Sequence, residues 1–375
     1  MAVYYVDKGV GAGGAGTEGD PFDSILDAFD ACFPAGAALA EDTTIYLKST
    51  SGTPDVVEST PTMEYTAGHT LTLVQTDRTS PAWDDTKYRL VRANSECLAT
   101  SGSGGHTWEL AHRLTCLNVQ FEQSSNSANT QTMIRSHTSR GRRGIFLFDS
   151  CMFKGSGDDT YSKEVFRCDS DRRFAALTVI RNCVIFNMGM AGGRLIRASI
   201  FGDSPGNIMF VNNTVDAEGI SVALSTNSPV TVGLVHFYNN ILNLGGFGGA
   251  RHVNDTSIVN DYNTCFFEDE DVIDSVDGVT VVWTHGANEI TNVISLPFSG
   301  EGDYRLSQTD AQVVDQGLSF EADYDMPGHI DTPDAPGFTH DHLETSTRPQ
   351  GAAWDIGAYE FIAFNYPRFL MGPKA

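Results

Sequence analysis

Residues 177–186 read LTVIRNCVIF, a segment in which apolar side chains at every second position lead into an Asn. The pattern apolar–x–apolar–x–x–(Asn or Ser)–x–apolar recurs along the middle of the chain. Its copies are Ile145–Leu147–Ser150–Met152, Leu177–Val179–Asn182–Val184, Ile208–Phe210–Asn213–Val215, Val235–Phe237–Asn240–Leu242 and, more weakly, Ile258–Asn260–Asn263–Cys265. The turn residues follow one another at steps of 32, 31, 27 and 23 residues. Alternation with period two indicates a strand with one buried face, and Asn suits a bend because it tolerates left-handed backbone.

A second pattern, offset from the first, supports the same repeat. Ile134-Arg135, Phe166-Arg167 and Ile196-Arg197 lie 32 and then 30 residues apart. Two patterns that share nearly one period describe a coil with several sides, whose strands stack about 4.8 Å apart over a continuous core. Residues 100–270 show no amphipathic helical pattern of the kind that alternates with strands in α/β proteins. The sequence therefore predicts an all-β chain, a right-handed parallel β-helix or solenoid.

The two ends differ from the middle. We expect an N-terminal cap over 1–40, the β-helix over 41–275, a loop-rich closing region over 276–361 and an apolar tail over 362–375. The cap combines a strand around Tyr4–Val6, a Gly-rich loop and a short amphipathic helix, with Asp20 as N-cap and Pro21 as its first residue. The first strand of the coil is expected at Thr44–Leu47. The tail, IAFNYPRFLMGPKA, is aromatic enough that we expect it to contact a partner.

Composition narrows the classes of partner. The chain has 48 acidic and 24 basic residues, a formal net charge of −24, so it is expected to bind neither nucleic acid nor anionic membranes. No window approaches the roughly 18–20 apolar residues that span a bilayer. The N-terminus shows no signal-peptide pattern. Seven cysteines, without CxxC spacing and mostly inside apolar runs, indicate buried thiols and no disulfide framework or zinc site.

Two terminal segments carry a family resemblance. The opening YYVDKGVGAGGAGTEGDPFDSILDAF (4–29), and the later GDYRLSQTDAQVVDQG (302–317) with DIGAYE (355–360), bracket nearly the whole chain. These segments resemble the first and last parts of pectate-lyase-like right-handed β-helix proteins. The resemblance implies the fold. It does not fix an activity, because this fold hosts lyases, hydrolases, epimerases, adhesins and phage proteins.

The most informative candidate site is a column of arginines. If Ile134, Phe166 and Ile196 point inward, Arg135, Arg167 and Arg197 point outward, one above another. His137, Asp169 and Ser199 follow two residues on. Guanidinium groups in such a column can donate paired hydrogen bonds to the carboxylates of an acidic polysaccharide. The alternative is that Asp169 and Asp171 neutralise the arginines and the column is purely structural.

A lyase mechanism would use the same strand. Arg167 or Lys163 would abstract the proton next to a uronate carboxylate, and Asp169 and Asp171 would hold a metal ion such as Ca²⁺. No cofactor is otherwise expected. Polygalacturonase-like members of the resembling family carry a fuller set of motifs, which this chain lacks.

Three other clusters have simpler interpretations. Asp158-Asp159 lies in GSGDDTYS and reads as a solvated turn. Glu268–Asp271 matches no calcium loop and reads as an acidic turn. His329, Asp331, His340, Asp341 and His342 lack helical spacing, so a zinc site there is less favoured than a loop.

Three functions compete on the sequence. The preferred one is a structural protein of a bacteriophage particle, a capsid decoration or spike-like component on the virion surface, which can bind glycans. The missing signal peptide and incomplete catalytic set favour it. It is expected to contact other virion proteins and to form a homo-oligomer, with a trimer as the guess. The alternatives are a secreted, extracellular polysaccharide lyase or hydrolase and a cell-surface adhesin module. The sequence thus leans away from an enzyme.

Overall fold

The computed structural model is a parallel β-helix. It describes residues 1–57, 61–63, 66–80, 82–92, 97–100, 110–123, 131–138, 143–155, 163–171, 177–188, 193–201, 207–217, 220–226, 235–243, 258–262, 265–266, 282–284, 298–300 and 303–306. Within these residues almost every strand pairs in parallel with the strand one turn of the coil away, as the sequence pattern predicts. The only antiparallel strand pair they contain is β25 (Phe298–Gly300) with β26 (Asp303–Leu306).

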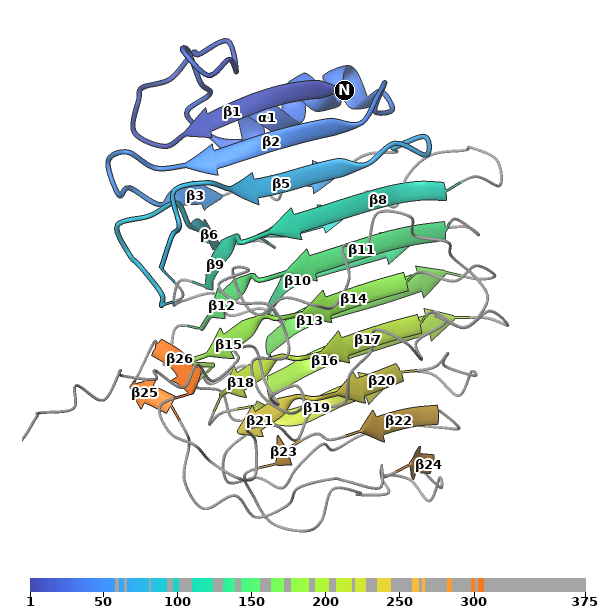
Figure 1. The fold of residues 1–375 in the computed structure, drawn as a ribbon. Helices are drawn as coiled ribbons and strands as arrows, with labels where there is room; N and C mark the ends of the chain where they lie inside the picture. The colour runs from blue at the N-terminus through green and yellow to red at the C-terminus, as the bar shows by residue number, and fades with distance from the viewer. Residues whose placement is uncertain are drawn as a thin grey trace, which may run out of the picture.

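Three parallel sheets form the sides of the coil (Figure 1). The ten-stranded sheet contains β1 (Ala2–Asp7), β2 (Thr43–Lys48), β5 (Leu71–Gln75), β8 (Leu110–Leu117), β11 (Arg143–Asp149), β14 (Leu177–Arg181), β17 (Asn207–Val211), β20 (Val235–Tyr238), β22 (Ile258–Tyr262) and β24 (Val282–Thr284). The eight-stranded sheet contains β3 (Asp55–Val57), β6 (Leu90–Arg92), β9 (Gln120–Gln123), β12 (Met152–Lys154), β15 (Val184–Phe186), β18 (Thr214–Asp216), β21 (Ile241–Asn243) and β23 (Cys265–Phe266). The six-stranded sheet contains β4 (Thr62–Met63), β7 (Leu98–Thr100), β10 (Gln131–Thr138), β13 (Lys163–Asp171), β16 (Gly193–Phe201) and β19 (Ile220–Thr226).

Each turn of the coil, called a rung here, visits the three sheets in a fixed order. The chain runs from β11 to β12 to β13 and returns to the first sheet at β14. In Figure 1 it travels leftward along the ten-stranded sheet, returns rightward along the six-stranded sheet behind, and descends with each rung, so the coil is right-handed. This is the hand that parallel crossover connections adopt.

One left-handed residue turns the chain from the ten-stranded to the eight-stranded sheet. In five successive rungs it has φ between 51° and 62°; the residues are Asn118, Ser150, Asn182, Asn212 and Asn239. The backbone hydrogen bonds continue through the bend, because Ser150 N donates to Arg181 O at 3.1 Å and Asn182 N to Val211 O at 3.2 Å. Asn is the residue that tolerates this backbone best after Gly.

The next position inward holds a ladder of buried asparagines. Asn213 Oδ1 accepts from Cys183 N at 2.9 Å, and Asn240 Oδ1 accepts from Asn213 N at 2.9 Å. Their amide groups donate to backbone carbonyls, Asn213 Nδ2 to Ile180 O at 2.9 Å and Asn240 Nδ2 to Phe210 O at 2.8 Å. Buried amides with both ends bonded hold neighbouring rungs in register.

The sequence alignment of the repeat is wrong by one residue in part of the chain. It equates Asn213 with Asn182, whereas the structure equates Asn212 with Asn182. As a result Leu147 and Val179, predicted to face the core, lie on the outer face, while Phe148 and Ile180 face inward. The reason is that β11 and β14 are apolar on both faces, so alternation alone cannot choose the inner one.

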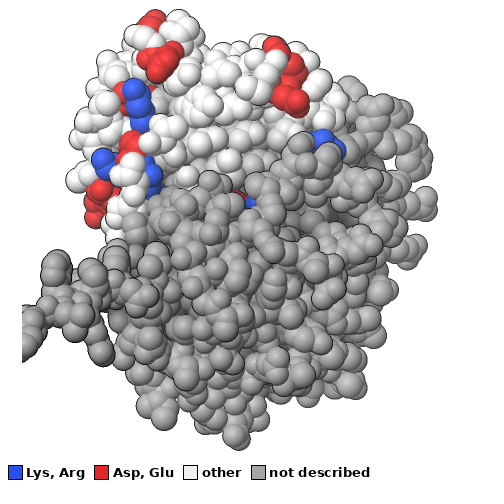
Figure 2. Space-filling view, viewed as in Figure 1, with Lys and Arg blue, Asp and Glu red and all other residues white. Residues whose placement is uncertain are grey.

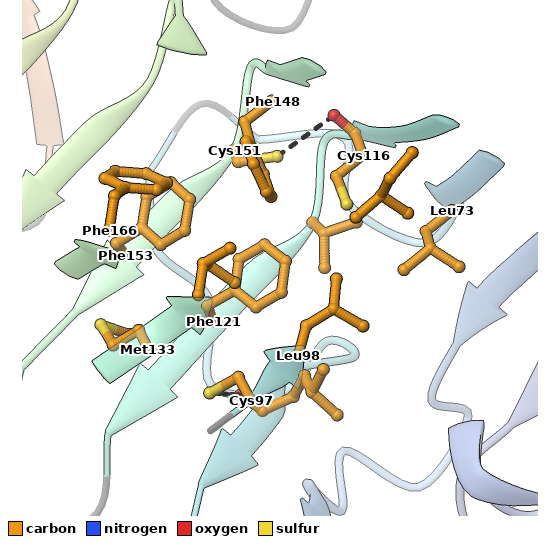
Figure 3. Packing of buried hydrophobic residues seen from close by; sticks show 14 of the residues in the cluster. Leu73, Cys97, Leu98, Cys116, Phe121, Met133, Phe148, Cys151, Phe153 and Phe166 are labelled. Atoms are coloured by element: carbon orange, nitrogen blue, oxygen red, sulfur yellow. Dashed lines mark hydrogen bonds between the residues drawn. The ribbon is translucent and has the colours of Figure 1, made fainter. Parts of the chain in front are cut away.

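The core is a continuous stack of apolar side chains from Val6 to Leu242. Phenylalanines dominate its middle: the rings of Phe121 and Phe153 stack at 5.0 Å, and Phe153 meets Phe166 edge-on at 4.8 Å (Figure 3). The described cysteine side chains are buried and unbridged, as predicted; they are Cys32, Cys97, Cys116, Cys151 and Cys183. Burial raises the pKa of the Cys116 and Cys183 thiols well above their ordinary value, so these thiols are inert.

A helix caps the N-terminal end, but it begins later than predicted. Helix α1 spans Ile25–Cys32 with Ser24 as N-cap, whose Oγ accepts from Asp27 N at 3.2 Å, and a 3₁₀ turn, η1 (Pro34–Gly36), follows. Asp20 is not the cap, because Phe22 still pairs with β1: its N donates to Tyr5 O at 2.9 Å, and this extended pairing delays the helix.

The apolar side of α1 joins the core of the coil, with Ile25, Ala28 and Phe29 buried beside Val6. One buried carboxylate, Asp55 in β3, ties the helix to the rungs below. Its Oδ2 accepts from Ile25 N at 2.7 Å and from the Tyr88 hydroxyl at 2.9 Å. The helix therefore closes the open end of the core, as terminal repeats of a solenoid require.

The predicted boundaries at the C-terminal side stay predictions. Of the closing region 276–361, the structure describes only β24, β25 and β26, and the tail 362–375 lies outside the described residues. Within the described part of the chain, no helix has the length and apolar character needed to cross a membrane.

Candidate functional site

The six-stranded sheet brings the predicted arginines together. Arg135 in β10 aligns with Arg167 in β13, which aligns with Arg197 in β16. We call these three residues the arginine ladder. In the same register it is preceded by Ala99 and followed by Ser225, so the ladder spans three rungs. Arg135 and Arg167 are half-buried; the side chain of Arg197 lies outside the described residues.

The backbone beneath the ladder is anchored by pairs of neighbouring apolar residues. Ile134 and Phe166, which precede the arginines, are buried in the core as predicted, and so is Ile196. Their neighbours Met133 and Val165 are buried too, so simple alternation of buried and exposed residues does not hold immediately before the arginines. Figure 3 shows Met133 and Phe166 directed toward Phe121 and Phe153. Close packing on the inner side fixes where the arginines leave the sheet.

The other predicted site residues lie in the same three strands. His137 aligns with Asp169 and Asp169 with Ser199, two positions beyond the ladder. Lys163 aligns with Gln131, and Asp171 with Phe201. The side chains of His137, Lys163, Asp169 and Asp171 lie outside the described residues, so their roles as ligand, base or metal ligands stay predictions.

One buried carboxylate sits beside the ladder and was missed by the sequence patterns. Glu164 in β13 is 1% exposed and its Oε2 accepts from the Thr132 hydroxyl at 3.0 Å in the rung above. In the next rung it aligns with Arg194. A buried acid three residues before Arg167 was detectable only as a polar residue inside an apolar strand, VFRC preceded by KE.

Metal binding finds no support among the described residues. They contain no group of three or more His, Cys, Asp or Glu side chains placed to hold an ion. The predicted clusters Asp158-Asp159 and Glu268–Asp271, and those at His329, Asp331, His340, Asp341 and His342, lie outside the described residues.

A second polar cluster, also missed, covers the outer face of the eight-stranded sheet. Lys154 Nζ lies 3.4 Å from Glu122, 3.5 Å from Asp85 and 5.0 Å from the Trp83 ring centre. Arg89 Nε completes it with Glu122 at 2.9 Å. Burial tends to raise the pKa of Asp85, but the hydrogen bond from Trp83 and the charges of Lys154 and Arg89 outweigh it, so the pKa lies below its ordinary value. With two acids and two bases in contact, this cluster fastens the loop at 76–89 and offers no uncompensated charge.

Comparison with known protein families, with curated proteins and with solved structures finds no match. The fold and the register of the site therefore carry the functional argument. They define the chain as a parallel β-helix with an arginine ladder on one sheet.

Proposed function

We propose that the chain is a β-helical surface component of a bacteriophage particle that binds an anionic glycan along its arginine ladder. The observation that carries the binding part is the register: Arg135, Arg167 and Arg197 occupy one column on three consecutive rungs. Adjacent rungs of a parallel sheet are about 4.8 Å apart, so the backbone positions of the three arginines lie nearly on one line along the coil.

Like charges at this spacing repel unless anions lie between or above them. A guanidinium group presents a planar fork that fits a carboxylate, and its charge persists at every physiological pH. A polymer with one carboxylate per sugar, such as a polyuronate, repeats its anions at a distance comparable to one rung. It can therefore meet all three arginines at once, which a single small anion cannot.

The ladder also explains how an acidic chain can bind an acidic polymer. The net charge of −24 repels polyanions over most of the surface. A local column of three cations offers a binding line within that field, and salt is expected to weaken binding because part of the attraction is long-range. In the alternative interpretation the column is purely structural, and Asp169 and Asp171 neutralise the arginines in place of a glycan.

The assignment to a phage particle rests on the fold, which some phage proteins adopt, and on the incomplete set of catalytic motifs in the sequence. A solenoid stacks parallel sheets rung upon rung and so presents long outer faces, which suit a decoration or spike-like part in contact with other virion proteins. The neighbours of its gene test this part. Capsid and portal genes beside it support the proposal, whereas sugar transporters and carbohydrate enzymes would favour a secreted enzyme.

Glycan binding is tested with polygalacturonate and, as the uncharged comparison, its methyl ester. We expect polygalacturonate to bind and the ester to bind much more weakly. The variant Arg135→Ala/Arg167→Ala should lose about a hundredfold in affinity or more, because each charge-assisted hydrogen bond contributes about 1.5–3 kcal/mol. Arg167→Lys keeps the charge without the fork and should fall between the two.

The matched control is Lys87→Ala, which removes one positive charge from the loop over the eight-stranded sheet and should bind like the unaltered chain. Equal binding by the double-arginine variant and the control would refute the ladder as the binding line. The same mixtures, followed by ultraviolet absorbance, report unsaturated products; their formation would replace the binding proposal with a lyase.

A further inference from the structure

A second surface, on a different sheet, has the properties of a binding site for an uncharged ligand. It covers the outer face of β1, β2, β5 and β8, the first four strands of the ten-stranded sheet. Three threonines follow one ladder column there, Thr44 aligned with Thr72 and Thr72 with Thr115. Beside them Tyr5 aligns with Tyr46. We call these five residues the tyrosine–threonine strip.

The strip faces solvent. In β2 and β5 buried residues alternate with half-exposed ones, and Thr44, Tyr46 and Thr72 are among the half-exposed residues. The inward neighbours of Thr44 and Thr72, namely Ile45 and Leu73, are fully buried in the core. Thr115 and both tyrosines are half-exposed as well.

The strip is free of charge in a strongly acidic chain. Figure 2 shows an uncharged surface over these strands, with acidic and basic side chains along its margins. At one margin Lys48 and Asp7 pair with each other at 3.4 Å. The outward positions between the margins hold only hydroxyl-bearing and apolar residues, including Val74 and Leu117. An ionic ligand gains nothing from such a face, whereas a neutral one avoids the repulsion of the rest of the surface.

The polar groups of the threonine column are its three hydroxyls. Among the described residues, none provides a hydrogen-bond partner for the hydroxyls of Thr44, Thr72 and Thr115. Each hydroxyl can both donate and accept, and each is repeated about 4.8 Å further along the axis. The Tyr5 and Tyr46 rings lie 5.2 Å apart and are tilted by 35°, so they form an aromatic platform at the N-terminal end of the threonine column.

We propose that the tyrosine–threonine strip binds a neutral polysaccharide that runs along the axis of the coil. One sugar of an extended glycan advances by a distance comparable to one rung, so successive sugars can bond successive threonines. The tyrosine rings stack against the apolar face of a sugar at one end. A second copy of this chain is the competing occupant, but its packing needs no repeating donor and acceptor at every rung.

The test removes the hydroxyls and keeps the shape. In Thr44→Val/Thr72→Val/Thr115→Val each side chain stays β-branched and of nearly the same volume, which preserves the strands. Binding is measured by affinity electrophoresis in gels that contain hydroxyethyl cellulose, galactomannan or dextran. We expect at least one of the three to retard the unaltered chain. The triple variant should bind that polymer about tenfold more weakly or worse, because three hydrogen bonds are lost.

Controls separate this site from the arginine ladder. Val56→Ala changes an exposed residue of the eight-stranded sheet and should bind the neutral polymer unchanged. Arg167→Ala should also leave neutral-polymer binding unchanged, and the triple variant should still bind polygalacturonate. Failure of one proposal therefore does not imply failure of the other.

Three results would overturn the proposal: no retardation of the unaltered chain by any of the three polymers, equal retardation of the triple variant, or a dimer in sedimentation that becomes tighter in the triple variant. The last would identify a second copy as the occupant, because added methyl groups strengthen apolar packing. If the triple variant melts at a lower temperature, Thr72→Val is compared with Thr72→Ser, which keeps the hydroxyl and should bind the polymer more tightly than Thr72→Val. Equal binding by these two variants overturns the proposal as well.

Discussion

The outer face of the ten-stranded sheet is built in two ways along one continuous set of columns. In the open region, over β1, β2, β5 and β8, the outward positions of these columns are half-exposed or exposed and hold Thr, Tyr, Val and Leu. In the covered region, over β11, β14 and β17, the same columns hold buried residues: Leu147, Val179 and Met209 in one, Asp149, Arg181 and Val211 in the other. The backbone and inner face repeat while the outer face changes.

The difference shows that the solenoid constrains its two faces separately. The inner face must fill a core whose cross-section is nearly constant, so Ile, Leu and Phe recur at each rung. The residues of the outer face depend instead on what packs against them at each rung. Buried outward residues form a second apolar cluster with Leu177 and Tyr238, and they contribute stability, whereas half-exposed ones are available to ligands.

The largest loss of stability is expected on breaking the buried ion pair of the covered region. Arg181 Nε and Nη2 both donate to Asp149 Oδ2, at 2.9 and 2.7 Å, and the Arg181 side chain is 2% exposed. Asp149→Ala removes the carboxylate to which both Arg181 nitrogens donate and should lower the free energy of unfolding by about 3–5 kcal/mol in urea titrations. The control, Leu117→Ala, changes the aligned residue of the open region and should cost about 1 kcal/mol or less. Similar losses in both variants would contradict the division of the sheet.

A smaller loss of stability is expected in the neighbouring column, whose outward residues are apolar in the covered region and polar in the open region. Met209 is 2% exposed, and Met209→Ala should lower the free energy of unfolding by about 2–3 kcal/mol, because it leaves a cavity. Thr72→Ala in the open region should change it by about 0.5 kcal/mol. Chemical denaturation of both variants measures the contrast. A Met209→Ala variant as stable as Thr72→Ala would mean that the covered region is not packed.

Sequence reasoning found the fold and the arginine ladder because both follow the period of the core. The arginines recur at 32 and 30 residues, the same steps as the apolar residues before them, so one alignment gives both. The tyrosine–threonine strip escaped because its threonines are 28 and then 43 residues apart. Loops of unequal length separate those rungs, and a search for one period cannot align them.

The errors of sequence reasoning have equally specific causes. The one-residue slip at Asn213 arose because two asparagines stand side by side, one in the left-handed bend and one inside, and a pattern that asks for a single Asn accepts either. Asp20-Pro21 has the composition of a helix start, but the pairing of Phe22 with Val6 keeps that segment extended, a contact between residues that are distant in sequence. Such long-range pairing overrides local capping signals.

The smallest expected effect concerns pH and the cap above the open region. Burial raises the pKa of Asp55 above its ordinary value of 3.8, although hydrogen bonds from Ile25 and Tyr88 oppose the shift. A carboxyl group with a raised folded-state pKa stabilises the fold below its unfolded pKa, and that stability is lost as the pH rises through the folded pKa.

Asp55→Asn stays neutral, and its Oδ1 can still accept both hydrogen bonds. The melting temperature of the variant relative to the unaltered chain should therefore rise between pH 4 and pH 7. The amide's own burial cost cancels in that difference, since it is the same at both pH values. A difference that is flat or falls with pH would contradict this prediction, because it would show that the hydrogen bonds from Ile25 and Tyr88 offset the full cost of burying the charged carboxylate.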